Sequence, residues 1–227
     1  MSTTPQSKYP MDMDRAGLKK VGRAVRERLA GNPAAYKVPS DGIELYAIGD
    51  FMTADECAKM IALIDETAKP STVFGLDYSS GYRTSYSGDV DPHDPFVKKI
   101  QRRIDDLLDI DPKFGETIQG QRYMPGQEFQ PHHDWFYPDT SYWEHEMSRG
   151  GQRSFTTMVF LNEVEAGGTT DFTELGLSIE PKPGVLLAWN NAKPDGLVNE
   201  NTMHAGRPVK EGVKYIITRW YRSREWY

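Results

Sequence analysis

Cysteine is nearly absent from this 227-residue chain, which contains only Cys57. A disulfide framework needs pairs of cysteines, and a thiolate zinc cage needs several of them close together. The sequence therefore excludes both. Any metal site in this chain must be built from histidine and carboxylate side chains.

Long hydrophobic runs are also missing. The densest apolar stretches, residues 185–189 and 215–218, are far shorter than the roughly 18 apolar residues that a membrane-spanning helix requires. Residues 1–10 are polar and residues 18–29 are rich in Lys and Arg, so there is no apolar signal-peptide core among them. We therefore expect a protein that does not span a membrane and that resides in the cytoplasm.

An excess of positive charge is missing as well, because the formal net charge is −6. Proteins that bind nucleic acid in bulk use a basic surface to release counterions, so we expect no nucleic-acid partner. The hydrophobic fraction of 38% and the charged fraction of 26% are typical of a globular chain. Its length fits one large domain better than two.

Three amphipathic helices are predicted in the first half of the chain. In residues 18–29, apolar residues recur at helical spacing between Lys and Arg residues. We expect the basic face of this helix to be solvated, with contact to nucleic acid or anionic lipid as the alternative. The second helix follows a capping box formed by Thr53 and Glu56. The third begins at Asp94 and Pro95, because Asp caps a helix and Pro fits its first position.

The second half consists of short β-rich runs separated by Gly, Pro and Asn. Helices followed by strands, without βαβ alternation, favour an α+β, mainly β fold in which N-terminal helices buttress an antiparallel jelly roll. We assign residues 1–40 to a tail and a basic amphipathic helix packed on the core, and residues 41–227 to the main domain. The predicted strands are residues 44–48, 117–123, 155–161, 169–172, 185–189 and 214–221.

A short motif with metal-binding side chains lies at residues 132–134, which read His-His-Asp. In an extended segment residues i and i+2 share a face, so His132 and Asp134 are expected to converge while His133 points away. Such a pair also arises by chance in a chain of this composition. It indicates a site only together with other residues.

One later residue, His204, completes a candidate metal centre, and another, Lys214, is a candidate for binding an anion. With His204 there are two imidazoles and one carboxylate, a facial triad that leaves three adjacent positions open on octahedral iron(II). Zinc competes for these ligands but prefers four-coordinate sites. Lys214 opens an apolar strand. It either projects inward and pairs with an anion, such as the distal carboxylate of a dicarboxylate, or points to solvent.

From residue 117 onward these residues belong to an ordered set of motifs. The set resembles the prolyl 4-hydroxylase family of iron(II)- and 2-oxoglutarate-dependent dioxygenases, whose core is a double-stranded β-helix, and the likeness covers roughly residues 40–227. The motifs are Tyr-x-x-Gly-Gln, Pro-His-x-Asp, Gly-Gln-Arg at 151–153, Phe-Leu-Asn at 160–162, Gly-Gly-x-Thr-x-Phe at 167–172, Pro-Gly at 183–184, His204, Pro208-Val209, Lys214 and Trp220.

The resemblance implies that residues 41–227 are the dioxygenase domain and assigns roles to seven of its side chains. The implied iron ligands are His132, Asp134 and His204. The residues for 2-oxoglutarate are Lys214, which would pair with its C5 carboxylate, and Tyr123, which would hydrogen-bond nearby. The catalytic positions that line the peptide groove and the active-site mouth are Arg153 and Trp220.

Other features bear on the substrate. By the same resemblance, Lys rather than Arg at position 214 favours peptidyl hydroxylation over nucleic-acid dealkylation. Phe129 stands where many family members carry Tyr, which leaves the identity of the target residue open. Residues 137–151 are expected to form either a lid over the substrate or an ordinary surface loop. Arg83 is either a groove residue or a structural one.

The implied reaction is oxidative decarboxylation of 2-oxoglutarate to succinate and carbon dioxide, coupled to hydroxylation of a prolyl residue in a protein or peptide. It would use Fe(II), 2-oxoglutarate and O2, and it raises ascorbate as an accessory reductant. Two alternatives stay open. One is the same chemistry on a free amino acid, a small molecule or another protein side chain. The other is a jelly-roll module that binds metal without turnover. The oligomeric state is left open.

Overall fold

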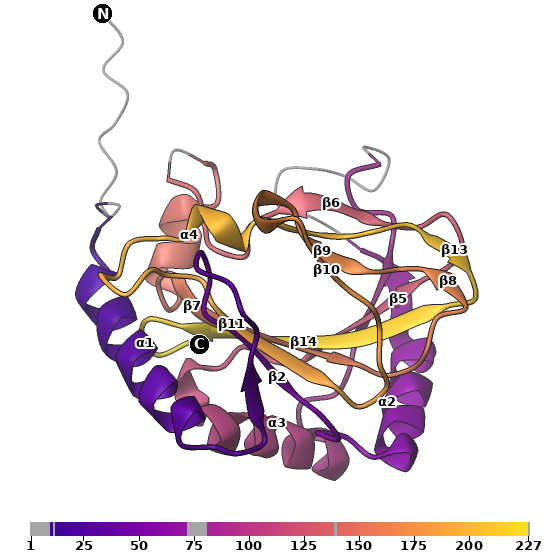
Figure 1. Cartoon of the computed structure of the whole chain (residues 1–227). Coiled ribbons are helices and arrows are strands. Elements are labelled where there is room, and N and C mark those ends of the chain that lie inside the picture. Colours follow the sequence, from indigo (N-terminus) through magenta and orange to yellow (C-terminus); the bar gives the residue numbers. More distant parts are fainter. Residues whose placement is uncertain (1–9, 11, 72–80, 139, 227) are drawn as a thin grey trace, which may run out of the picture.

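Two antiparallel sheets face each other at the centre of the computed structural model, which describes residues 10, 12–71, 81–138 and 140–226. Three helices lie on the outer side of the larger sheet (Figure 1). This architecture confirms the predicted α+β, mainly β, double-stranded β-helix buttressed by N-terminal helices. The tail predicted for the first eight or so residues lies outside the described residues.

The larger sheet has eight strands, the smaller has four, and two more strands form a separate ladder. The order in the larger sheet is β1 (Ala35–Lys37), β2 (Leu45–Ile48), β11 (Leu186–Asn190), β7 (Arg153–Phe160), β14 (Lys214–Arg222), β5 (Gln119–Tyr123), β4 (Tyr86–Asp89) and β3 (Ala68–Pro70). The order in the smaller sheet is β10 (Leu177–Ile179), β9 (Thr170–Phe172), β12 (His204–Gly206) and β6 (Phe129–His132). The ladder pairs β13 (Val209–Glu211) with β8 (Ala166–Gly167).

Helix starts follow the predicted capping signals. Thr53 and Glu56 form the reciprocal capping box, and the Asp94 carboxylate accepts from two backbone N–H groups of the following turn, with Pro95 in the first position. The helices are α1 (Arg15–Ala30), α2 (Ala54–Thr67), α3 (Pro95–Leu108) and α4 (Trp143–Ser148); short 3-10 turns are η2 (Pro112–Phe114), η3 (Thr173–Leu175) and η4 (Glu200–Thr202).

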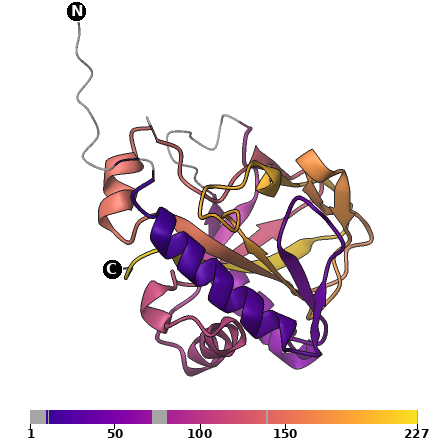
Figure 2. The same ribbon diagram turned by 60° about the vertical axis from the view of Figure 1, so that its left-hand side comes forward.

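Helix α1 crosses the outer side of the molecule beside α3 and against β7 (Figure 2). Residues Leu18, Gly22, Val25 and Leu29 form its buried stripe. The intervening Lys19, Lys20 and Arg23 are exposed, as expected for a helix packed on the core with a solvated basic face. The assignment of residues 1–40 to a unit of their own stays a prediction.

Helix α2 packs unusually close to β4 and β5. A Cβ atom at Gly120 would clash with the Ile64 side chain, so glycine at this position permits the helix to approach the sheet. Ile64 is fully buried at this contact. This close packing covers the outer face of the sheet at β5, the strand that ends at Tyr123.

Apolar side chains form two main cores. One lies between the helices and the larger sheet and includes Ile64, Ile100 and Phe155. The other lies between the two sheets and includes Phe160, Phe172 and Trp189. The second core packs against the histidine pair of β6 and β12, which is described below. No helix in the described ranges is both long and apolar enough to cross a membrane.

Candidate metal centre and active site

Three side chains that can ligate a metal converge between the sheets. His132 ends β6 and His204 begins β12, and the register of these paired strands places the two residues directly opposite each other. Asp134 joins them, with its Oδ2 atom 3.8 Å from Nε2 of His204. One potential ligand atom from each residue lies within 4.8 Å of the others. The three residues predicted from the sequence are therefore brought together.

Asp134 reaches this position in a different way from the one expected. Strand β6 ends at His132, and Asp134 lies in a bend beyond it, so the two residues do not share one face of a continuous strand. Instead, neighbouring side chains fix the carboxylate. Thr156 donates a hydrogen bond to Asp134 Oδ2 at 2.8 Å, and Asn191 donates to the Thr156 hydroxyl at 2.9 Å. These contacts explain why the Asp134 carboxylate lies beside the two histidines although the chain bends after His132.

The hydrogen bonds of the two imidazoles fix their tautomers. Nδ1 of His132 lies 2.9 Å from the Gln130 carbonyl oxygen, and Nδ1 of His204 lies 2.9 Å from the Thr202 carbonyl oxygen. A carbonyl oxygen only accepts, so each Nδ1 must carry the proton. In the neutral form of each ring, Nε2 then presents a lone pair to the centre, which is the arrangement found for ligating histidines.

The electrostatics favour the metal-binding forms of His132 and Asp134. Desolvation lowers the pKa of His132 to about 3, so its imidazole is neutral near pH 7. Burial by itself raises the pKa of Asp134. The nearby imidazoles, Arg153 and the Thr156 hydrogen bond outweigh burial and leave this pKa below its usual range. Two imidazole nitrogens and one carboxylate match the donor set of a two-histidine, one-carboxylate iron(II) site.

Lys214 lies deep in the same inner pocket. It begins β14, its side chain is about 1% exposed, and its Nζ atom donates to the Thr170 hydroxyl at 3.2 Å. Within the described ranges, no carboxylate oxygen lies at ion-pair distance from this ammonium group. Burial lowers the pKa of Lys214 to about 7. The solvent-facing alternative is therefore wrong, and the site holds a buried cation that an anionic ligand would stabilise.

Tyr123 lies directly opposite Lys214 in the β5–β14 pair, and the lysine Nζ is 5.5 Å from the centre of its ring. The tyrosine side chain is buried, and its hydroxyl donates to Gln121 Oε1 at 2.8 Å. Its position in the inner pocket agrees with the predicted place beside the co-substrate. The predicted hydrogen bond to the co-substrate stays a prediction.

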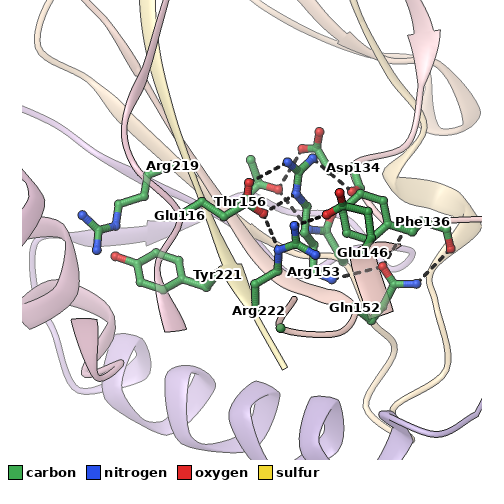
Figure 3. A network of polar contacts seen from close by, with 12 residues as sticks. Glu116, Asp134, Phe136, Glu146, Gln152, Arg153, Thr156, Arg219, Tyr221 and Arg222 are labelled. Atoms are coloured by element: carbon green, nitrogen blue, oxygen red, sulfur yellow. Dashed lines mark hydrogen bonds and ion pairs between the residues drawn. The ribbon is translucent and has the colours of Figure 1, made fainter. Parts of the chain in front are cut away.

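Arg153 belongs to a buried network of charged groups (Figure 3). Its guanidinium group binds both oxygens of Glu116, at 2.7 and 2.8 Å, and stacks 4.1 Å above the Trp220 ring. Arg222 binds the same Glu116 carboxylate and also Glu146 of α4. The positive charge of Arg153 is therefore already neutralised inside the protein. Residues Glu116, Glu146 and Arg222 were not predicted, because buried partners cannot be identified from residue type alone.

Two connected spaces surround these residues. The inner pocket has a volume of about 40 Å³ and contains the three ligands, Lys214 and Tyr123. The outer cavity has a volume of about 940 Å³ and opens onto the surface. Their walls share Arg83, Phe129, His132, Asp134 and Trp220. Trp220 therefore lies where the outer cavity meets the inner pocket, as expected for a residue at the active-site mouth.

The outer cavity has aromatic walls. His133 faces away from the metal ligands, as expected, but it lines this cavity beside Trp135, with ring centres 4.6 Å apart. Tyr137 continues the wall. In residues 140–151, Trp143 and Met147 of α4 pack into a small core with Phe136, so much of the expected loop is a packed helix.

Arg83 combines both of the roles that the sequence left open. Its side chain is about 7% exposed, and it hydrogen-bonds to Ser85 and Gln119. Its guanidinium group also lies 4.7 Å above the Phe129 ring, which in turn stacks on His132 with ring centres 3.6 Å apart. Arg83 is thus a structural residue that also lines both cavities.

Comparison with known proteins agrees with this geometry. The model of the 2OG-Fe(II) oxygenase superfamily matches residues 118–222. Probable prolyl 4-hydroxylase 8 of Arabidopsis thaliana is 30% identical over 256 residues, covering 99% of this chain and 85% of that protein. Prolyl 4-hydroxylase 5 of the same plant is 33% identical over 201 residues, covering 78% of this chain and 67% of its own length.

A solved structure shows the same relationship in three dimensions. The 2-oxoglutarate complex of the viral collagen prolyl hydroxylase from Paramecium bursaria Chlorella virus-1 is 31% identical, with a TM-score of 0.63. The match covers 79% of this chain and 96% of the viral one. The chain belongs to the prolyl 4-hydroxylase family of 2-oxoglutarate- and iron(II)-dependent oxygenases.

Proposed function

We propose that this protein is a dioxygenase that uses Fe(II), 2-oxoglutarate and O2 to hydroxylate a prolyl residue in a peptide or protein, with succinate and carbon dioxide as co-products. One observation carries this proposal. The three candidate ligands and a buried lysine without a carboxylate partner in the described ranges line the same inner pocket. Iron(II) would bind the three candidate ligands, and a dicarboxylate would bind the iron through one end and neutralise the buried lysine with the other.

The roles of the inner residues follow from their contacts. His132, Asp134 and His204 would hold the metal through two imidazole nitrogens and a carboxylate. Lys214 binds the distal carboxylate of 2-oxoglutarate, and Tyr123 lies against the same end. Once bound, iron and 2-oxoglutarate supply the oxidising chemistry that places oxygen on an unactivated carbon. The protein fixes their geometry and limits the access of water.

The outer cavity is large enough to accept part of a peptide substrate. Its volume of about 940 Å³ lies at the upper end of the range for small-molecule sites, and its aromatic walls offer broad apolar surfaces. Trp220 connects it to the iron site, and the indole N–H of Trp220 has no acceptor within the described ranges. We assign the Trp220 ring, together with the Arg153 guanidinium group that stacks on it, to positioning the substrate beside the iron.

Substrate-dependent succinate release tests the proposal. Wild-type protein with iron(II) and 2-oxoglutarate is given a proline-containing peptide, the same peptide with Ala in place of Pro, or free proline. We expect succinate only with the first, accompanied by the gain of one oxygen atom on the proline in a mass spectrum. Release with free proline alone would instead establish the small-molecule alternative, and oxygen on another side chain would establish a different peptidyl target.

Anaerobic spectroscopy separates an oxygenase from a binding module. Metal-free protein titrated with iron(II) and 2-oxoglutarate is expected to develop a visible charge-transfer band that needs both components. The Lys214→Ala variant should need more 2-oxoglutarate for the same band. A band without oxygen consumption when air and the peptides are admitted would favour the module that binds metal without turnover.

Two expectations concerning conditions stay predictions. We propose ascorbate as the accessory reductant, which is tested by its effect on the number of turnovers before inactivation. We also propose cytoplasmic residence, which is tested by fractionation of cells that express the full chain.

A further inference from the structure

Asp134 differs from the other two ligands in its backbone setting. His132 and His204 lie on paired strands, so the ladder between β6 and β12 holds them in place. Asp134 lies in a bend beyond the end of β6, and no strand within the described residues pairs with it. Its position must therefore be fixed by side chains from other segments.

Gln152, just before β7, supplies such a support. Its amide binds the backbone of Phe136 on both sides: Oε1 accepts from the Phe136 N–H at 2.7 Å, and Nε2 donates to the Phe136 carbonyl oxygen at 2.9 Å. Figure 3 shows this amide against Phe136, next to the network around Arg153. The clamped residue is two positions after Asp134. A single side chain thus replaces the missing strand partner for this segment.

The clamp lies in the interior. Gln152 is about 5% exposed and Phe136 about 3% exposed. If the amide were removed, a buried backbone donor and a buried backbone acceptor would lose their partners, which the segment avoids only by moving. Arg153 NH1 also approaches the Asp134 carbonyl oxygen, at 3.4 Å. Adjacent residues therefore hold the Asp134 segment at two points.

Gln152 is itself anchored to the N-terminal helix. Its backbone N–H donates to Oδ2 of Asp14, the residue that precedes α1, at 2.8 Å. Asp14 is buried, and it also forms an ion pair with Arg224 at 2.9 Å. Gly151 has a positive φ of 75°, and a Cβ atom there would meet the Asp14 carboxylate. This contact explains why the motif Gly-Gln-Arg begins with glycine.

We infer that Gln152 is a positioning residue for the metal centre, which acts by clamping the Phe136 backbone and so placing the Asp134 carboxylate. Gln152 is not assigned contact with metal, co-substrate or substrate. The inference rests on the proposed function only in taking His132, Asp134 and His204 as metal ligands. It predicts that loss of the amide weakens and distorts metal binding before any catalytic step is considered.

Cobalt(II) binding to metal-free protein tests this role without turnover. Its visible ligand-field bands report both affinity and coordination geometry. Gln152→Ala is expected to bind cobalt(II) about tenfold or more weakly than wild type, with altered bands, which is the size of effect typical for groups that orient metal ligands. The matched control is Asn162→Ala. Asn162 also holds backbone groups, donating to the Val213 carbonyl and accepting from the Tyr215 N–H, but none of these residues lies next to a metal ligand.

Gln152→Met guards against a variant that fails to fold. Met keeps the length and approximate volume of the side chain and adds no buried charge, but it removes both hydrogen bonds to Phe136, so we expect a loss of cobalt(II) affinity similar to that of Gln152→Ala. Wild-type affinity and bands in both Gln152 variants would overturn the inference, as would an equal loss of affinity in Asn162→Ala. If wild type itself binds no cobalt(II), the proposed metal centre fails as well, so the two failures are distinguishable.

Discussion

His132 and His204 occupy directly opposed positions in the β6–β12 pair, and their ring centres lie 4.3 Å apart. Antiparallel pairing thus brings together two residues that are distant in the chain. Each ring is held by a hydrogen bond from Nδ1 to a backbone carbonyl within its own segment, so both Nε2 atoms point to the same place. The centre is therefore preorganised by strand register.

Replacing one of these imidazoles should strongly weaken metal binding. We expect His204→Ala to retain less than about a tenth of the wild-type iron(II) affinity and to release no measurable succinate, because two ligands remain of three. Metal content after reconstitution checks the first expectation. His133→Ala is the control, because His133 is adjacent in sequence to the ligand His132 but faces away from the metal centre. Equal metal content in the two variants would contradict the assignment of His204.

Lys214 should make 2-oxoglutarate binding depend on pH. Its pKa is lowered to about 7 by burial, and pairing with a carboxylate would raise it. Below this value the lysine is already charged, so affinity should be nearly constant. Above it, binding must take up a proton, so affinity should fall by about tenfold per pH unit until the pKa of the complex is reached. Calorimetric titration of the iron-free protein at several pH values measures this slope.

The matched variant for this prediction is Lys214→Met, which keeps the length of the side chain without its charge. It should bind 2-oxoglutarate weakly at every pH and show no slope above pH 7. The ligand-free wild type should also become more stable as pH rises from about 7 toward the ordinary lysine value of 10.5, because the unfolded chain binds the proton more tightly. The same slope in wild type and variant would remove Lys214 from this role.

The sequence predicts the chemical residues of the site better than their supports. His132, Asp134, His204 and Lys214 are recognisable because their residue types are chemically specific and lie in ordered motifs. Their convergence depends on β6 and β12, which have four and three residues and carry no alternating pattern long enough to be predicted. The register between two such short strands is a property of the folded chain.

The residues that support the site could not be predicted from residue type. Gln152, Thr156 and Asn191 are ordinary polar residues, and their importance comes from the backbone or carboxylate atoms that they meet in space. The bend at Asp134 creates the need for them, and a period-two argument assumes that no bend is present. Helix starts, by contrast, were predictable because capping is a local interaction between neighbours such as Thr53 and Glu56.

Glu56 should limit stability in acid. Both of its oxygens accept from Arg103 at 2.7 Å, and this pairing is the main reason that its pKa is lowered to about 2. A lowered carboxyl pKa contributes stability above the ordinary value of 4.5, and this contribution disappears as pH falls toward 2. Urea unfolding across this range should show a shallower loss of stability in Glu56→Gln than in wild type. Glu66→Gln, at an exposed position of the same helix, should keep the wild-type slope.

A buried ion pair beneath the larger sheet should contribute strongly to the stability of the α3 interface. Asp105 of α3 pairs with Arg219 at 3.0 Å and accepts from the Tyr221 hydroxyl at 2.7 Å, and both charged side chains are about 4% exposed.

Asp105→Asn leaves the arginine charge buried without its counter-ion, so we expect a loss of about 3 kcal/mol in the free energy of unfolding. Tyr221→Phe should lose about 1 kcal/mol. Asp106→Asn, which breaks the exposed pair with Arg102, should change stability by less than about 0.5 kcal/mol. Similar losses for the two aspartate variants in urea unfolding would mean that Arg219 finds another partner or water when Asp105 is gone.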